Sequence, residues 1–229
     1  MSNTDFTIFK EEMSWLFKPT DTIEFSTATP TFSGPFISTF PTLHQLLEQA
    51  SVLDLTVTKK KSSSTYKLFT WTNEQGEKSG WLCDWETTGK EITLLPEHQL
   101  LLENMGGIQA SYTQVDVEEQ RLTDNQNFIF TKSQCRKGIG DWSDLYEEAC
   151  EMEEVKQIDT NNLLCFAGEA NGNETFYDLT TRQVLLFAAD HAFDNVEVLE
   201  GQPEYTFYTI NNAPLFVDYV ELLAKQWLR

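Results

Sequence analysis

The segment LLCFAGEANGNETFYDLTTRQVLLFAADH, residues 163–191, predicts the fold class, because it contains three short strands separated by two sharp turns. The expected strands are Leu163–Gly168, Thr175–Leu179 and Val184–Ala188. The first is an apolar run interrupted only by Cys165, which is typical of a strand buried on both faces. Residues 171–173 (NGN) and 180–182 (TTR) supply the turns. A three-stranded meander of this kind needs a second layer to cover it.

Several segments outside the meander have the pattern of helices that could form this layer. Residues 94–108 carry Pro96 in the first helical turn and end at Gly106-Gly107, where a helix commonly needs a positive φ to stop. Residues 213–228 carry a wide apolar stripe and should pack on the sheet. That stripe consists of Leu215, Phe216, Tyr219, Leu222, Leu223 and Trp227. A further helix is expected over residues 42–51.

The first half of the chain contains further strand signals. The expected strands are residues 53–58, 66–72, 81–85 and 112–117, with the second and third joined as an aromatic hairpin. Residues 7–17 fit a helix or a strand equally well. Residues 20–41 contain three prolines and predict extended, irregular chain. We therefore expect residues 1–60 to form an N-terminal extension packed on a domain of residues 61–229, the two making one compact unit.

Length and composition indicate a folded protein with a sizeable core. The chain has 229 residues, of which 40% are hydrophobic and 13% aromatic, and this excludes disorder as its overall state. No stretch approaches the roughly 18 apolar residues of a membrane helix. The N-terminal residues lack the basic and apolar regions of a signal peptide, so we expect a cytoplasmic protein without membrane contact. Its four cysteines form no CxxC pair, which favours reduced core thiols over a metal site.

Charge is the most pronounced compositional feature. Sixteen basic and 36 acidic residues leave a net charge of −20, which argues against nucleic acid as a direct partner. The charge is uneven, because residues 1–115 hold 14 acids and 8 bases whereas residues 116–229 hold 22 acids and 8 bases. Two interpretations remain open: the acids serve solubility alone, or they bind a basic protein partner.

Residues 141–157 concentrate this charge on a predicted amphipathic helix. The expected buried stripe is Trp142, Leu145, Ala149, Met152 and Val155. Like charges four residues apart on the outer face cost a few tenths of a kcal/mol per pair, and the sequence tolerates that cost. We therefore expect the outer face and the acidic segment 194–204 to bind a partner. The candidate residues are Asp144, Glu147, Glu148, Glu151, Glu154, Asp194, Glu197 and Glu200.

Several motifs, taken in order, resemble the SUKH superfamily, which comprises immunity proteins of bacterial polymorphic toxin systems and fungal cell-wall regulators. Leu95-Pro96 opens a helix that ends in Asn104-Met105-Gly106-Gly107. The meander has a polar turn, an aromatic strand ending in Asp178, a Thr-rich turn and Val184. His191 follows it, and the last helix, which begins Leu215-Phe216 after Asn212-Ala213, is similar to the family's closing helix. The resemblance covers about residues 90–229.

This resemblance implies an α+β fold with a mostly antiparallel β-sheet flanked by helices. It also implies no catalytic residue and a function by binding: the protein sits on a cognate toxin, commonly a nuclease or deaminase, and blocks it. We likewise expect no cofactor and no metal. We accordingly expect a protein toxin, basic in charge, as the partner, with the chain itself a monomer or weak homodimer. A scaffold or regulatory protein without a toxin partner is the alternative.

Catalysis is a third hypothesis, and it rests on Asp190, His191 and Asp194, where a carboxylate could orient the imidazole. Adjacent residues of a strand point to opposite faces, which weakens the Asp190–His191 pair. His44 and His98 lie on expected helices without a carboxylate or thiol pattern, so we expect a surface or partly buried position for both.

Overall fold

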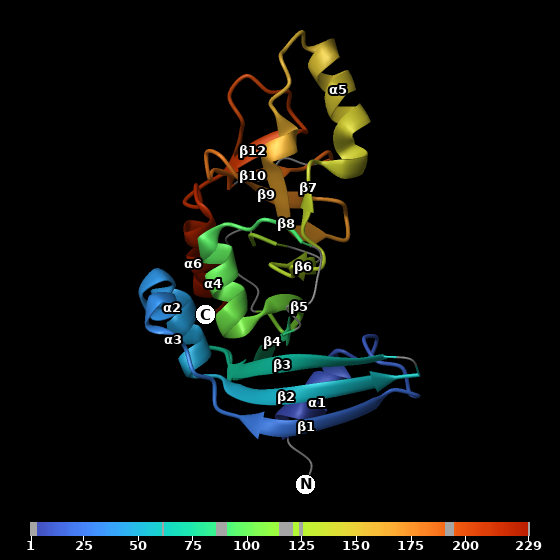
Figure 1. The fold of residues 1–229 in the computed structure, drawn as a ribbon, viewed down its shortest axis with the longest axis vertical. Coiled ribbons are helices and arrows are strands. Elements are labelled where there is room, and N and C mark those ends of the chain that lie inside the picture. The colour runs from blue at the N-terminus through green and yellow to red at the C-terminus, as the bar shows by residue number, and fades with distance from the viewer. Residues whose placement is uncertain are drawn as a thin grey trace.

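The computed structural model describes residues 4–60, 62–85, 91–114, 121–123, 126–190 and 195–228 (Figure 1). The strands are β1 Thr22–Ala28, β2 Ser51–Lys59, β3 Ser62–Thr72, β4 Lys78–Asp84, β5 Gly107–Tyr112, β6 Gln126–Ile129, β7 Arg136–Lys137, β8 Leu163–Glu169, β9 Glu174–Asp178, β10 Val184–Phe187, β11 Val196–Val198 and β12 Phe207–Ile210. The α-helices are α1 Thr4–Glu12, α2 Gly34–Thr39, α3 Pro41–Glu48, α4 Pro96–Met105, α5 Ser143–Met152 and α6 Phe216–Trp227. Two 3-10 turns, η1 Gly140–Trp142 and η2 Thr160–Asn162, complete the described elements.

These strands form one antiparallel sheet in the order β1-β2-β3-β4-β5-β6-β8-β9-β10-β12-β11, with β7 paired to β8. The expected α+β class, an antiparallel sheet flanked by helices, is confirmed. The meander is confirmed as well, since β8, β9 and β10 pair in succession. β2 and β3 lie on either side of the boundary that we expected between extension and domain, and all of β2 pairs with residues 62–70 of β3. The domain boundary itself stays a prediction.

The two faces of the sheet are covered differently. One face carries a single continuous core beneath α2, α3, α4 and α6. The opposite face carries two separate cores, one beneath α1 over β2–β5 and one beneath α5 over β8–β12. Alternation along β8 shows why its sequence is apolar throughout: Leu164 and Phe166 enter the continuous core, whereas Leu163 and Cys165 enter the core beneath α5.

Helix α4 begins and ends where the sequence predicts. Leu95 is extended and Pro96 occupies the first turn, where its missing N–H is not needed. Gly106 ends the helix with φ +78°, and a Cβ at this position would collide with the carbonyl oxygen of Asp84. Only glycine therefore lets α4 stop here and β5 begin at the next residue.

His98 of α4 lies at the centre of the continuous core and is fully buried, which corrects the expectation of a surface or partly buried position. Its Nε2 lies 2.9 Å from the Phe130 carbonyl oxygen, which can only accept, so Nε2 carries the proton. Its Nδ1 carries no proton and lies 3.1 Å from the Tyr177 hydroxyl, whose oxygen accepts the Leu95 N–H at 3.3 Å. The Tyr177 O–H therefore donates to a neutral imidazole. Burial lowers the pKa of His98 to about 4.

Two expectations for the first half of the chain were wrong. Residues 20–41 are not irregular, because they contain β1, which pairs with β2 along seven residues, and the short helix α2. The Ser33 hydroxyl accepts the Phe36 N–H at the start of α2, and Pro35 stands in its first turn. The strand expected at residues 112–117 starts earlier, since β5 follows Gly106 directly and ends at Tyr112. Residues 115–117 lie outside the described ranges.

The helices of the described ranges are all too short or too polar to cross a bilayer.

The neutral state of His98 predicts a pH-dependent stability. The unfolded chain binds a proton near pH 6.5 and the folded chain only near pH 4, so protonation favours unfolding between these values. We expect the free energy of unfolding to fall by about 3 kcal/mol as the pH drops through this window. In His98→Gln, whose amide can also donate to Phe130 and accept from Tyr177, this component of the loss should be absent. Urea titrations of both proteins from pH 7.5 to 3.5 measure the difference; parallel curves would contradict the assignment.

Candidate partner-binding surface

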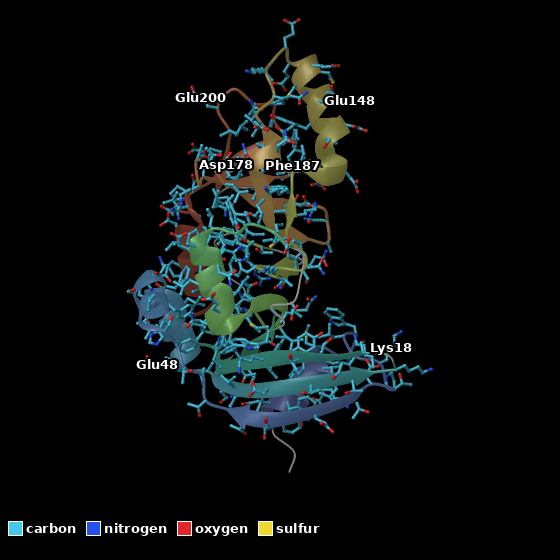
Figure 2. All side chains as sticks on the ribbon, viewed as in Figure 1. Lys18, Glu48, Glu148, Asp178, Phe187 and Glu200 are labelled. Atoms are coloured by element: carbon cyan, nitrogen blue, oxygen red, sulfur yellow. The ribbon has the colours of Figure 1, made fainter. Side chains whose placement is uncertain are left out.

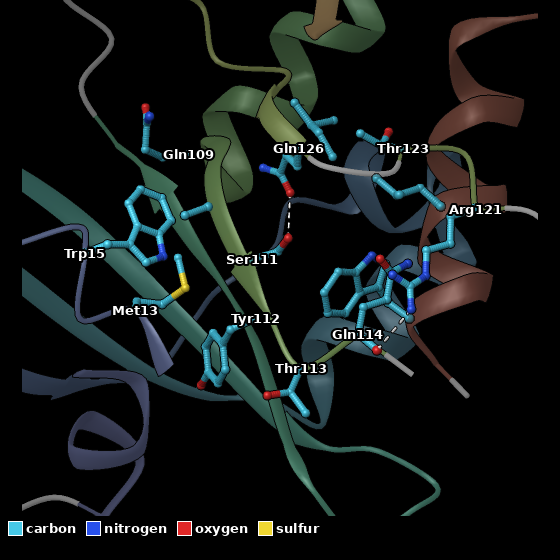
Figure 3. Close-up of a pocket in the computed structure, with 14 residues that line it drawn as sticks. Met13, Trp15, Gln109, Ser111, Tyr112, Thr113, Gln114, Arg121, Thr123 and Gln126 are labelled. Carbon is cyan, nitrogen blue, oxygen red and sulfur yellow. Dashed lines mark hydrogen bonds between the residues drawn. The ribbon is translucent and has the colours of Figure 1, made fainter. Parts of the chain in front are cut away.

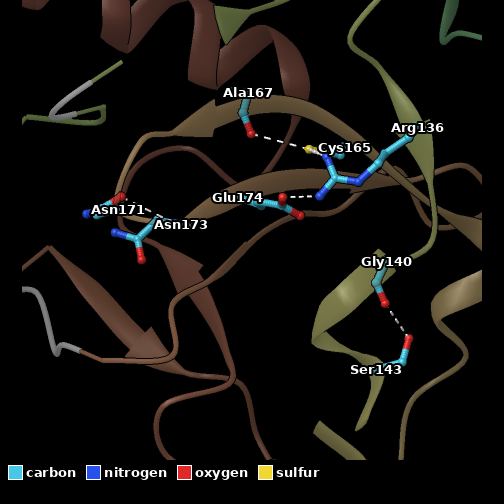
Figure 4. A network of polar contacts seen from close by, with 8 residues as sticks. All are labelled: Arg136, Gly140, Ser143, Cys165, Ala167, Asn171, Asn173 and Glu174. Carbon is cyan, nitrogen blue, oxygen red and sulfur yellow. Dashed lines mark hydrogen bonds and ion pairs between the residues drawn. The ribbon is translucent and has the colours of Figure 1, made fainter. Parts of the chain in front are cut away.

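The chain enters α5 through a turn held by an ion pair (Figure 4). Arg136 of β7 pairs with the Glu174 carboxylate of β9, and its Nη1 donates to the Cys165 sulfur at 3.5 Å. Burial raises the pKa of Glu174, and the Arg136 guanidinium opposes that shift. Gly138 and Gly140 follow with φ +71° and +55°, and they turn the backbone toward the helix. The ion pair thus ties the segment that leads into α5 to strand β9 of the meander.

The buried face of α5 differs from the predicted stripe. The structure buries Tyr146 and Cys150, while Leu145 is 39% and Met152 is 85% exposed. The row of residues that faces the core instead begins at Trp142 and continues through Tyr146 and Cys150, with a spacing of four residues. The helix also ends at Met152, shorter than predicted, and Val155 lies beyond it. The Trp142 ring packs 5.6 Å from that of Phe187.

Tyr146 joins α5 to the acidic segment that follows β11. Its hydroxyl accepts the Ile158 N–H at 2.9 Å and donates to the Gln202 side-chain oxygen. The Gln202 amide in turn donates to the Lys156 carbonyl at 3.1 Å. Burial raises the pKa of Tyr146 to about 12, so the hydroxyl keeps its proton. Two segments that the sequence treats as separate candidates are therefore held together at one end of the molecule.

Figure 2 shows Glu148 and Glu200, two of the predicted partner-binding acids, at this end. Four of the predicted acids lie exposed on α5: Asp144, Glu147, Glu148 and Glu151. Glu154 is exposed just past the helix with φ +54°, and Glu197 on β11 and Glu200 after it are exposed as well. Asp194 lies outside the described residues. None of the ion pairs between described residues involves these acids, so their charges are directed to solvent.

Apolar side chains stand among these charges. Beside Leu145 and Met152 of α5, Val198 of β11 is 42% exposed and Tyr205 is 44% exposed. Residues 141–157 hold seven acids and one base, and residues 195–205 hold three acids and no base. We call this surface, formed by α5 and residues 195–205, the acidic end. Apolar anchors within a charged rim are the composition expected of a protein-binding surface.

The described residues provide little for other chemistry. No group of three or more His, Cys, Asp or Glu within the described ranges is placed to hold a metal ion. All four cysteines are buried and free, and burial raises the pKa of Cys83, Cys135 and Cys165, which makes them poor nucleophiles. His191 and Asp194, two members of the candidate catalytic group, lie outside the described residues.

A cavity of about 260 Å³ opens where the sheet parts between β5 and β6 (Figure 3). These strands pair only through Ile108 and Ile129, although the Ser111 hydroxyl still bridges to Gln126 at 2.6 Å. The described lining is mainly polar and aromatic, with Arg121 as its one charged side chain. A single guanidinium supplies neither an acid–base pair nor a ligand set, so the acidic end remains the better candidate.

Comparison of the chain with protein-family models, curated proteins and solved structures found no match. Tyr146, Gln202 and the exposed Leu145 and Met152 were missed by sequence reasoning. The spacing of Trp142, Tyr146 and Cys150 is the one local signal that could have identified the buried face.

The contribution of the Tyr146 hydroxyl to holding α5 and residues 195–205 together should be measurable. Tyr146→Phe removes its hydrogen bonds to Ile158 and Gln202 and should lower the free energy of unfolding by about 1–2 kcal/mol. Amide hydrogen exchange should accelerate at Ile158. Tyr205→Phe, which alters a ring that is 44% exposed in the same acidic end, is the matched control and should leave both quantities unchanged. Unaltered exchange at Ile158 in Tyr146→Phe would contradict the link.

Proposed function

We propose that this chain is a SUKH-like immunity protein that neutralises a basic protein toxin, of nuclease or deaminase type, by binding it one-to-one. The observation that carries the proposal is the acidic end, where unpaired carboxylates surround exposed apolar side chains on a well-anchored helix. The α+β fold and helix α4, which begins at Pro96 and is stopped by Gly106, agree with the family resemblance. We propose that the protein acts in the cytoplasm.

Electrostatics gives the proposal its physical basis. An enzyme that acts on a polyanionic nucleic acid gathers basic residues around its substrate site. An acidic protein competes for that basic surface, and the opposite charges accelerate association. Charge alone gives little affinity after desolvation, whereas buried apolar anchors at the centre of an interface contribute most of it. Leu145 and Met152, which stand between the glutamates of α5, are placed to act as such anchors.

Rigidity of the acidic end supports a binding role. The Arg136–Glu174 ion pair fixes the start of α5, Tyr146 ties its middle to residues 158 and 202, and Cys150 packs into the core below. A surface that is ordered before it meets its partner loses less conformational entropy on binding. The acids are therefore presented in a fixed pattern.

The alternative is a scaffold or regulatory protein that has no toxin partner. The same acidic end would then bind a different basic protein. A protection assay separates the two possibilities: co-expression with the toxic product of the neighbouring gene should rescue growth under the immunity proposal and fail to do so under the alternative.

Charge reversal at the acidic end is the sharpest binding test. Glu147→Lys, Glu148→Lys and Glu151→Lys together should weaken binding to the neighbouring gene's product by roughly ten-fold or more, mainly through slower association at low salt. The salt dependence of association should fall with it. Titration and stopped-flow measurements at two salt concentrations give both values.

The matched control reverses three exposed acids outside the acidic end, Glu11, Glu74 and Glu77. Its net charge equals that of the test variant, so a general charge effect would weaken both proteins alike. Equal affinities for the test variant and the wild type would remove the acidic end from the interface.

A further inference from the structure

Strand β1 forms one edge of the sheet and presents a long unprotected side. All seven of its residues pair with β2, from Thr22 opposite Thr58 to Ala28 opposite Val52, and no register shift interrupts the pairing. In the strand order β1 is terminal, and Figure 1 shows no described element beyond it. Alternate N–H and C=O groups along its outer side are therefore open to a further strand.

This edge lacks the usual devices that prevent sheets from associating. Short length, proline, lysine, bulges and inward charges normally blunt an edge. Within β1 there is no proline and no basic residue, and Glu24 is its single charge. The opposite edge, β11, is by contrast only three residues long and carries Glu197 at its middle. The two edge strands of the sheet therefore differ in how well their sequences protect them against association.

The charge around β1 permits a second copy to approach. Residues 4–28 and 51–72, which form α1, β1, β2 and β3, together hold six acids and six bases. This region is neutral in a chain whose net charge is −20. Like-charge repulsion between two copies is therefore weakest at this edge and strongest at the acidic end.

We propose that two copies of the chain associate through β1, antiparallel and centred on Phe25. In this register Phe25 faces Phe25 of the second copy, and Ile23 faces Thr27 of the second copy. Glu24 faces Ser26 of the second copy, so the strand's one charge never meets itself across the pair. Phe25 is half-buried and stacks on Phe6 with ring centroids 4.5 Å apart, and the second copy would cover the rest of its ring. The strand is self-complementary, as a two-fold interface requires.

The dimer leaves the proposed toxin-binding surface free. β1 and α5 lie at opposite ends of the long axis in Figure 1. Pairing through β1 would direct the two acidic ends away from each other, so each copy could bind a partner independently.

Two substitutions at Ser26 test the register by opposite effects. Ser26→Glu places a second carboxylate opposite Glu24 in both symmetric pairs, and should raise the dimer dissociation constant by roughly three- to ten-fold. Ser26→Lys places an ammonium there and should lower the constant by a similar factor, with the gain decreasing at high salt. Analytical ultracentrifugation of each purified protein over a concentration series, without any partner, measures the constants. The result is thus independent of the toxin hypothesis.

Asp54 of β2 requires a control, because it lies opposite Ser26 within the same chain. In a Glu24→Gln background residue 24 has no charge with which residue 26 of the second copy can interact. Ser26→Glu and Ser26→Lys should then differ little in dimer affinity. Thermal unfolding of each variant confirms that the chain remains folded. The proposal is overturned if wild type and Ser26→Lys both sediment as monomers at every concentration. It is also overturned if the two substitutions shift the constant in the same direction, or if their difference persists without Glu24.

Discussion

The neutral imidazole of His98 links the helices and strands that enclose the continuous core. It connects α4 to β9 through Tyr177 and to the chain after β6 through Phe130, in a core where no water could replace either hydrogen bond. Its ring also stacks on Phe216 of α6, with centroids 4.9 Å apart. One side chain thus fixes both helices that cover the middle of the sheet. A buried polar group that is fully satisfied gives a core a single arrangement, because any shift would leave two groups unpaired.

The arrangement of cores separates the two ends of the molecule. A single core under α2, α3, α4 and α6 runs along one face and keeps the sheet rigid. On the other face, α1 and α5 cover opposite ends. Each end can therefore carry its own surface chemistry, neutral around β1 and strongly acidic around α5. This division allows self-association at one end and partner binding at the other without competition between them.

Local signals in the sequence were sufficient for some elements. Pro96 and Gly106 mark the ends of α4 by backbone chemistry alone, and the turns of the meander are determined by residues 171–173 and 180–182. The positions of the exposed acids on α5 also followed from the helical period, although its buried face did not. Trp142 starts two possible rows, one through Leu145 and one through Tyr146, and apolar composition favoured the wrong one.

The remaining features depend on contacts that no local pattern contains. The Tyr146 hydroxyl is compatible with burial only because Ile158 and Gln202, which is 56 residues away, provide hydrogen-bond partners. His98 is buried because Tyr177 and Phe130, 79 and 32 residues away, satisfy both of its nitrogens. Residues 22–28 look polar and irregular in sequence, and they form a strand because β2 offers a complementary edge. In each case the tertiary partner decides the structure.

Carboxyl footprinting of the complex with the neighbouring gene's product tests whether the acidic end is the binding surface. Carbodiimide labelling followed by mass spectrometry reports the solvent access of each carboxylate. We expect strong protection of Glu147, Glu148, Glu151 and Glu200 on binding, with Glu11, Glu74 and Glu77 labelled as in the free protein. Unchanged labelling of the α5 glutamates in a saturated complex would contradict this expectation.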